Sequence, residues 1–198
     1  MNPVVTSSDV RVDSYGGNAS VLDIATLTPT IIGRGAFKGN ESLVEVTVPE
    51  GVTHIEDEAF ANCVNLTAVR LPSTLLRLGE GAFRYCRSLV QVELPGSVVE
   101  IGPQAFRRCS SLKSIEIPEN VLIIEAGTFA KCTSLETVVI LGDLRSIEAT
   151  AFEDCPKLDA INIPESIDYV APDAFGASRS YEEDRFKAEV LNIMYSVV

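Results

Sequence analysis

The sequence predicts an α/β repeat solenoid with a parallel β-sheet on one face and short helical turns on the other. Its 198 residues repeat with a period of 23, and alanine or threonine precedes a phenylalanine at Phe37, Phe60, Phe83, Phe106, Phe129, Phe152 and Phe175. A cysteine follows three positions later in five units, at Cys63, Cys86, Cys109, Cys132 and Cys155. One unit cannot bury its own apolar face, so a fixed period of this length is typical of stacked repeats that share one core.

The segment around each phenylalanine has helical spacing. Phe60, Cys63 and Leu66 follow one another at steps of three. That spacing predicts about two turns of helix with one buried face. The equivalent phenylalanines are expected to form a ladder through the core.

A short strand follows each predicted helical turn. Val69 and Leu71 alternate with Ala68 and Arg70, which indicates a strand with one buried face. Pro72 ends the strand because proline has no N–H to donate to a sheet. Proline recurs at this position in every unit but one, at Pro49, Pro95, Pro118 and Pro164, with Leu141 as the exception. A local irregularity is therefore expected at 141–143.

The two ends depart from the period. Three segments are predicted: an N-terminal cap over 1–31, the repeat array over 32–178 and a C-terminal capping helix over 179–198. The cap is expected to be a β-hairpin or irregular strands, set one residue out of register with the later units. The C-terminal segment begins with a capping box, Ser180-Tyr-Glu-Glu183, and continues with one apolar helical face. A partner-binding or membrane-surface helix is the alternative, which the acidic start disfavours.

The repeated pattern also resembles a known family. Ile/Leu-Gly-x-x-Ala-Phe-x-x-Cys-x-x-Leu-x-x-Val/Ile-x-Ile/Leu-Pro-x-x-Val, over about residues 32–175, is similar to the BspA-like class of leucine-rich repeats. The resemblance implies a right-handed, curved solenoid used for adhesion or protein binding. It also implies an exported or surface protein, because members of this class are commonly found there.

Composition limits the partners and leaves the compartment open. A net charge of -12 argues against nucleic acid and fits a soluble monomer. No apolar run is long enough to predict a transmembrane segment. Residues 1–20 have neither the basic nor the apolar region of a signal peptide, which favours the cytoplasm if Met1 is the native start. The family resemblance favours secretion or the cell surface.

The cysteines are predicted to be free thiols that fill core space. Their spacing of 23 residues is unlike that of a Cys-x-x-Cys metal site. On packed helical turns, neighbouring cysteines would be about 8–10 Å apart, beyond the roughly 7 Å that a disulfide allows.

No catalytic residues, metal site or cofactor are expected. His54 is the only histidine, and no serine or cysteine has a histidine placed beside it by a local motif. The carboxylates follow surface positions of the repeat, so no acid/base pair is indicated. The sequence therefore predicts a protein that is not an enzyme.

Two surfaces are candidates for binding a partner. The first is the exposed sheet face, whose candidate residues are Glu45, Thr47, Arg70, Gln91, Glu93, Ser114, Glu116, Thr137 and Asn162. The second is a basic stripe around the helical turns of adjacent coils, made of Arg84, Arg87, Arg107, Arg108 and Lys131. The stripe is either a docking strip for an acidic partner or a solvated face that balances Glu80 and other acids.

The function predicted from these features is a non-enzymatic protein-binding or adhesion module of the leucine-rich repeat type. Its partner is expected to be a protein or a glycan. The alternative is a structural scaffold or spacer within a larger surface protein.

Overall fold

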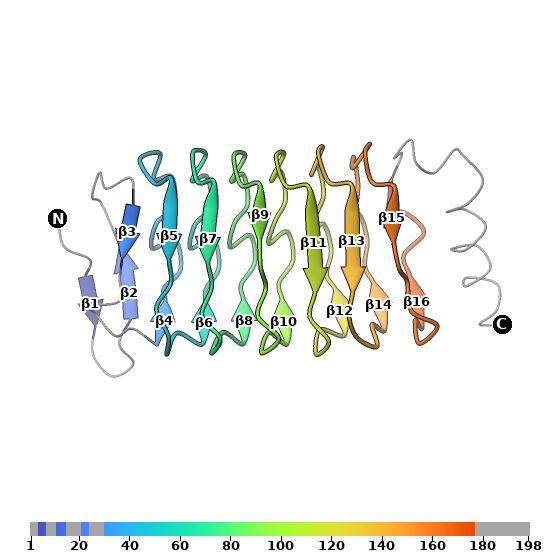
Figure 1. Ribbon diagram of the computed structural model, residues 1–198, viewed down its shortest axis with the longest axis horizontal. Coiled ribbons are helices and arrows are strands. Elements are labelled where there is room, and N and C mark those ends of the chain that lie inside the picture. The colour runs from blue at the N-terminus through green and yellow to red at the C-terminus, as the bar shows by residue number, and fades with distance from the viewer. Residues whose placement is uncertain (1–3, 7–10, 15–20, 24–29, 177–198) are drawn as a thin grey trace.

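The computed structural model shows an elongated stack of coils (Figure 1). It describes residues 30–176 and, before them, the backbone of 4–6, 11–14 and 21–23. The helix predicted over 179–198 lies outside the described residues, and the boundaries predicted at 31 and 178 stay predictions.

One strand of each coil joins a parallel ladder, called ladder A here. It contains β3 (Val21–Asp23), β5 (Glu45–Thr47), β7 (Ala68–Arg70), β9 (Gln91–Val92), β11 (Ser114–Ile117), β13 (Thr137–Ile140) and β15 (Ala160–Ile161). Glu45 pairs with Ala68, 23 positions on, whereas Val21 pairs with Glu45, 24 positions on. The predicted parallel sheet and the one-residue offset of the first unit are therefore confirmed.

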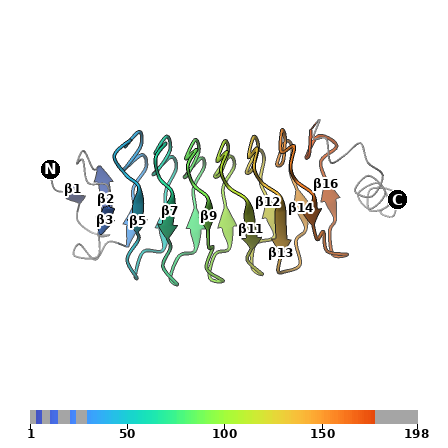
Figure 2. The same cartoon turned by 45° about the horizontal axis from the view of Figure 1, so that its top comes forward.

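A second parallel ladder, ladder B, was not predicted. Its two-residue strands are β4 (Ile31–Ile32), β6 (His54–Ile55), β8 (Arg77–Leu78), β10 (Glu100–Ile101), β12 (Ile123–Ile124), β14 (Ser146–Ile147) and β16 (Tyr169–Val170). At the N-terminal end β2 (Arg11–Ser14) pairs with β4, and β1 (Val4–Thr6) runs antiparallel to β2. The two ladders form separate rows along the long axis (Figures 1 and 2).

The predicted helical turns are wrong, since no described residue is in a helix. Residues 56–66 and their equivalents form consecutive tight turns, in which Ala61 N–H donates to Glu58 C=O at 3.0 Å. The N–H of Glu58 itself donates to Glu80 C=O of the next coil at 2.8 Å. Glu58 and Asn62 have φ of 55° and 61°, and left-handed residues interrupt a helix. The apolar spacing of three residues therefore reflects tight turns and not a helix. Some backbone N–H groups of these turns donate within the turn, and others donate to the neighbouring coil.

The predicted phenylalanine ladder is confirmed. Successive rings from Phe37 to Phe175 stack with centroids 4.8–5.6 Å apart and planes within 17°. All seven rings are buried. The aromatic spacing matches the distance between neighbouring strands of a sheet, because each coil contributes one ring and two strands.

The five cysteines form a second internal ladder of free, buried thiols. Each Sγ donates a hydrogen bond to a phenylalanine carbonyl of the preceding coil, as in Cys109 to Phe83 at 3.2 Å. The spacing given as the reason for free thiols is wrong, because neighbouring coils lie about 5 Å apart rather than 8–10 Å. In-register Cβ atoms at that spacing are still farther apart than the roughly 3.8 Å typical of a disulfide.

The turn after ladder A depends on the proline. In five described coils the N–H three residues beyond it donates to the proline carbonyl, at Val52, Leu75, Val98, Val121 and Ile167. Among the described coils, the one with Leu141 in place of proline has no such bond, so the predicted irregularity is confirmed. Both ladders nevertheless continue past it. They are interrupted one coil earlier instead, between β9 and β11 and between β10 and β12.

Candidate binding surfaces

The predicted sheet-face residues lie on the outer side of ladder A. Alternation along the strands places their neighbours in the core, and eight of the nine are exposed, with Thr137 half-buried. In-register pairing puts Thr47 beside Arg70 and Ser114 beside Thr137. The interruption after β9 divides this row into Glu45–Glu93 and Ser114–Asn162.

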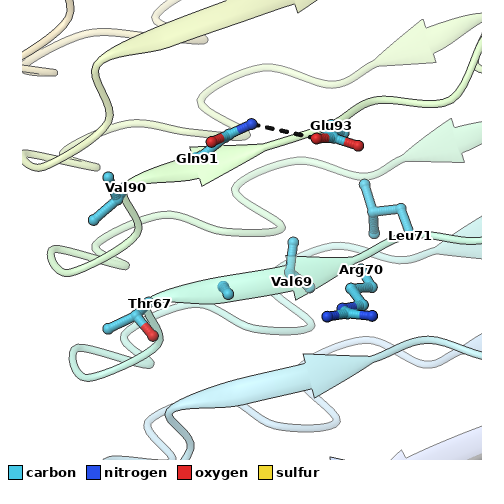
Figure 3. A pocket seen from close by; sticks show the side chains of 8 residues that line it. Thr67, Val69, Arg70, Leu71, Val90, Gln91 and Glu93 are labelled. Carbon is cyan, nitrogen blue, oxygen red and sulfur yellow. Dashed lines mark hydrogen bonds between the residues drawn. The ribbon is translucent and has the colours of Figure 1, made fainter.

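An open groove of about 580 Å³ lies on the first half of the row, over β7 and β9. Its lining includes Val69, Arg70, Gln91 and Glu93 (Figure 3). Gln91 Nε2 donates to Glu93 Oε1 at 3.3 Å, while the Arg70 side chain points away from this pair. Within the described part of the chain, Arg70 has no ion pair. The groove therefore presents a guanidinium and a carboxylate that do not neutralise each other.

Ladder B offers an informative contrast to that pair. Arg77 and Glu100 are also 23 residues apart, in neighbouring strands β8 and β10. Here the guanidinium and the carboxylate meet at 3.1 Å. The same two residue types at the same spacing are thus joined on ladder B and separate on ladder A.

Asn162 has a structural task that the sequence did not reveal. Its Oδ1 accepts from Ile140 N–H at 2.7 Å, and its Nδ2 donates to Ile140 C=O at 2.8 Å. The side-chain amide therefore continues the hydrogen bonding of β13 beyond the end of β15. A partner at this position would meet an amide whose main donor and acceptor are already engaged.

The basic stripe lies on the turns between ladders B and A, where stacking brings Arg84, Arg87 and Arg108 around one ring. The Tyr85 N–H donates to the Arg107 C=O at 2.8 Å. The guanidinium carbons of Arg84, Arg87 and Arg108 lie 5.8, 5.9 and 5.3 Å from the centre of the Tyr85 ring. Tyr85 was not predicted as a site residue, although its position between Arg84 and Arg87 was a visible signal.

The two ends of the stripe are neutralised. Arg84 forms an ion pair with Glu58, and Lys131 Nζ lies 3.2 Å from Asp154 Oδ2. A hydrogen bond from Lys38, reinforced by the charges of Lys38 and Arg84, lowers the pKa of Glu58. In the described part of the chain, Arg87, Arg107 and Arg108 have no carboxylate partner, so the positive charge is concentrated at the centre.

An exposed apolar row, which was not predicted from the sequence, directly precedes three strands of ladder B. Leu76, Val99 and Leu122 occupy equivalent positions of three successive coils and are 40%, 53% and 49% exposed. Leu122 and Leu141 also line an open groove of about 550 Å³. The visible signal was an aliphatic residue two positions before each of the buried residues Leu78, Ile101 and Ile124, at a spacing of 23.

His54 lines a pocket of about 290 Å³ together with Arg34, Asp57 and Arg77. His54 Nδ1 lies 2.8 Å from Thr53 Oγ1, and the nearby Arg34 and Asp57 form an ion pair at 2.5 Å. The hydrogen bond from Arg34 lowers the pKa of Asp57. In the described residues, no group of three potential ligands is placed to hold a metal ion, and no helix has the length and apolar character needed to cross a bilayer.

Stacked coils with a parallel ladder and an inward leucine in each repeat define a leucine-rich repeat protein. The chain belongs to the BspA type leucine rich repeat family, whose pattern matches residues 19–120 and 99–197 in six copies. The resemblance stated from the sequence is therefore confirmed. Comparison with curated proteins gave no match.

Several solved structures are similar to this one. A leucine-rich repeat protein of T. pallidum, TpLRR, is 27% identical with a TM-score of 0.87, over 97% of this chain and 92% of that one. A leucine rich cell surface protein of Faecalibacterium prausnitzii is 28% identical with a TM-score of 0.78, over 90% of this chain and 50% of that one. A Bacteroides ovatus leucine-rich repeat protein is 26% identical with a TM-score of 0.75, over 86% and 46%. The chain thus spans about half the length of the last two proteins.

Proposed function

We propose that this chain is a non-enzymatic protein-binding module that holds its partner on the outer face of ladder A. The carrying observation is the groove over β7 and β9, where Arg70 is unpaired and Glu93 is bonded only to a neutral amide. A charged group that has no partner in the free protein can form an ion pair on binding. No existing ion pair has to be broken first, so the free-energy cost of binding is smaller.

The regular shape of ladder A supports this proposal. Its outward side chains stand on a rigid framework whose inward side chains are buried from β5 to β13. A rigid surface loses little conformational freedom on binding, which favours affinity. Leucine-rich repeat families are generally non-enzymatic, and the similar Faecalibacterium prausnitzii protein is described as a cell surface protein. Together these points favour an adhesion role at a cell surface.

The test is a binding screen with matched variants. The immobilised full chain is screened by surface plasmon resonance against a panel of extracellular matrix and serum proteins. A saturable partner should lose at least about tenfold in affinity, roughly 1.4 kcal/mol, with Arg70→Ala/Glu93→Ala. The control is Arg77→Ala/Glu100→Ala, which removes the same residue types at the same spacing from ladder B.

Two results would count against the proposal. One is a partner whose affinity falls equally with both double variants, because the effect would then not be specific to ladder A. The other is the absence of any binder in the panel. That result would favour the scaffold or spacer role, in which the coils hold other parts of a larger protein apart.

A further inference from the structure

The centre of the basic stripe has a local charge that the rest of the protein does not share. Arg87, Arg107 and Arg108, named the arginine cluster here, have no carboxylate partner among the described residues, on a chain with a net charge of -12. The equivalent positions two coils further on carry Glu153 and Asp154. A positive patch bounded by acidic residues is a localised site rather than a general property of the surface.

The Tyr85 ring brings together two members of the arginine cluster, Arg87 and Arg108. Arg87 and Arg108 come from neighbouring coils and lie against the same ring, at 5.9 and 5.3 Å. Attraction between a guanidinium and an aromatic ring of this kind contributes on the order of 0.5–1 kcal/mol at exposed sites. Tyr85 is therefore a positioning residue that brings like charges together.

The arrangement is unfavourable in the absence of a ligand. The Nε atoms of Arg84 and Arg108 are buried without a hydrogen-bond partner. The left-handed backbone of Tyr85 and Arg108 does not distinguish this place, because Lys131 and Asp154 share it at the equivalent positions, with φ of 64° and 54°. Unpaired guanidinium groups with unsatisfied donors are typical of a binding site for an anion.

We propose that the arginine cluster binds the sulfate groups of a linear sulfated polysaccharide. Guanidinium groups bind planar or tetrahedral oxyanions through two parallel hydrogen bonds. The three arginines come from two neighbouring coils about 5 Å apart and lie on the turn surface rather than in a single pocket. Cations at this separation match a chain that carries anionic groups at short intervals.

A thin polyanion fits this surface better than an acidic globular protein does. Asp154 and Glu153 lie on the same turn face two coils away, and Glu80 is exposed at the start of the Tyr85 turn. A broad acidic surface would be brought against these carboxylates. A single polysaccharide chain covers only the arginine cluster, and salt screens charges more than about 8 Å away at physiological ionic strength.

The test uses substitutions that the chain itself accepts at equivalent positions. The variant Arg87→Ser/Arg107→Ala/Arg108→Asn takes its residues from Ser110, Ala61 and Asn62. The control Arg34→Ser/Arg77→Ser/Arg145→Ser removes the same charge from arginines that are paired with Asp57, Glu100 and Asp168. Thermal unfolding checks that both variants fold. Binding of fluorescent heparin fragments to the full chain is measured over a salt series.

Wild type and control should bind heparin alike, whereas the cluster variant should bind at least about tenfold more weakly at low salt. The slope of log affinity against log salt should fall by about two to three, because each lost contact releases about one counterion fewer. Tyr85→Phe should retain binding and Tyr85→Asn should weaken it, which separates ring-mediated positioning from loss of the hydroxyl.

Three outcomes would overturn the proposal. Equal weakening of cluster and control variants would show a net-charge effect alone. Undiminished binding of desulfated heparin would exclude sulfate as the recognised group. Tighter binding of poly-glutamate of matched charge would indicate an acidic protein segment instead. Since the arginine cluster is separate from the groove of ladder A, failure here leaves the proposed function standing, and the reverse also holds.

Discussion

The inside and the outside of each coil follow opposite rules. Inside, the same residue type recurs from coil to coil, as in the phenylalanine and cysteine ladders. Outside, the residue at one position changes with each coil, from Thr47 to Arg70 to Glu93 on ladder A. Stacking places equivalent positions about 5 Å apart. Identical apolar groups at that distance pack favourably, whereas identical charges repel each other.

Places where neighbouring outer positions carry the same charge are therefore informative. Arg87, Arg107 and Arg108 keep like charges together, and so do Glu125 and Glu148 in neighbouring coils. In the first group, Arg87 and Arg108 lie against the same aromatic ring, that of Tyr85. The second has no such support, and burial, followed by the charge of Glu148, raises the pKa of Glu125.

The largest expected effect comes from ionising the internal thiols. Burial raises the pKa of Cys63 and of Cys155 to about 12 and shifts the pKa of the three thiols between them upward. Unfolded thiols ionise near pH 8.5, so the unfolded state loses protons that the folded state retains. The free energy of unfolding should therefore fall above about pH 8.5, with a limiting slope of roughly 1.4 kcal/mol per thiol per pH unit.

Denaturant titrations between pH 8 and 11 measure this slope. Cys109→Ala should reduce the thiol contribution by about one fifth, while other titrating groups affect both proteins alike. A thiol reagent at pH 8 should react with all five cysteines on unfolding and with none in the native protein. Rapid reaction of Cys109 in the folded state would contradict the buried ladder.

Truncating one ring should show how strongly the interior depends on stacking. Phe106→Ala should lower the free energy of unfolding by about 3–5 kcal/mol, because it leaves a cavity between two stacked rings. Ser114→Ala, on the exposed side of ladder A, should stay within about 0.5 kcal/mol of wild type. Chemical denaturation of both variants measures the difference, and comparable values would refute the contrast between inside and outside.

Asn162 is an outward-facing residue whose side chain is hydrogen-bonded to the backbone of the neighbouring strand. Asn162→Ala should cost about 1–2 kcal/mol, since both backbone groups of Ile140 lose their side-chain partner. Gln91→Ala removes a side-chain amide that is bonded only to exposed Glu93, and should be nearly neutral. Chemical denaturation measures the loss of unfolding free energy in both variants. Equal losses would show that the hydrogen bonds from Asn162 to β13 do not contribute to stability.

The smallest expected effect concerns the stacked glutamates. Burial first, then the charges of Glu148 and Glu100, raise the pKa of Glu125. Its ionised form is therefore disfavoured in the folded state, and stability is lost as the pH rises through the folded pKa. Glu125→Gln should be a few tenths of a kcal/mol more stable than wild type at pH 7 and equal to it at pH 3. Glu136→Gln, at an exposed site, serves as the control for net charge, and an equal gain there would remove the local explanation.

The sequence alone determined the period, the family and the contents of the core. Phe60, Cys63 and Leu66 recur every 23 residues, and equivalent apolar residues can be buried together only if the coils stack in register. The strand of ladder A was also readable, because Ala68–Arg70 alternates and Pro72 follows. The effect of Leu141 on its turn followed from the missing proline.

Only the tertiary structure decided which backbone hydrogen bonds form between coils and which charged side chains form ion pairs. The turn segments have helix-like apolar spacing, yet Glu58 donates to the next coil instead of to its own. Ladder B consists of two-residue strands, which are too short to show alternation and exist only because adjacent coils pair. Whether an arginine meets a carboxylate also depends on side-chain direction, which joins Arg77 to Glu100 and leaves Arg70 apart from Glu93. These features arise from contacts between residues about 23 positions apart, and no local pattern records them.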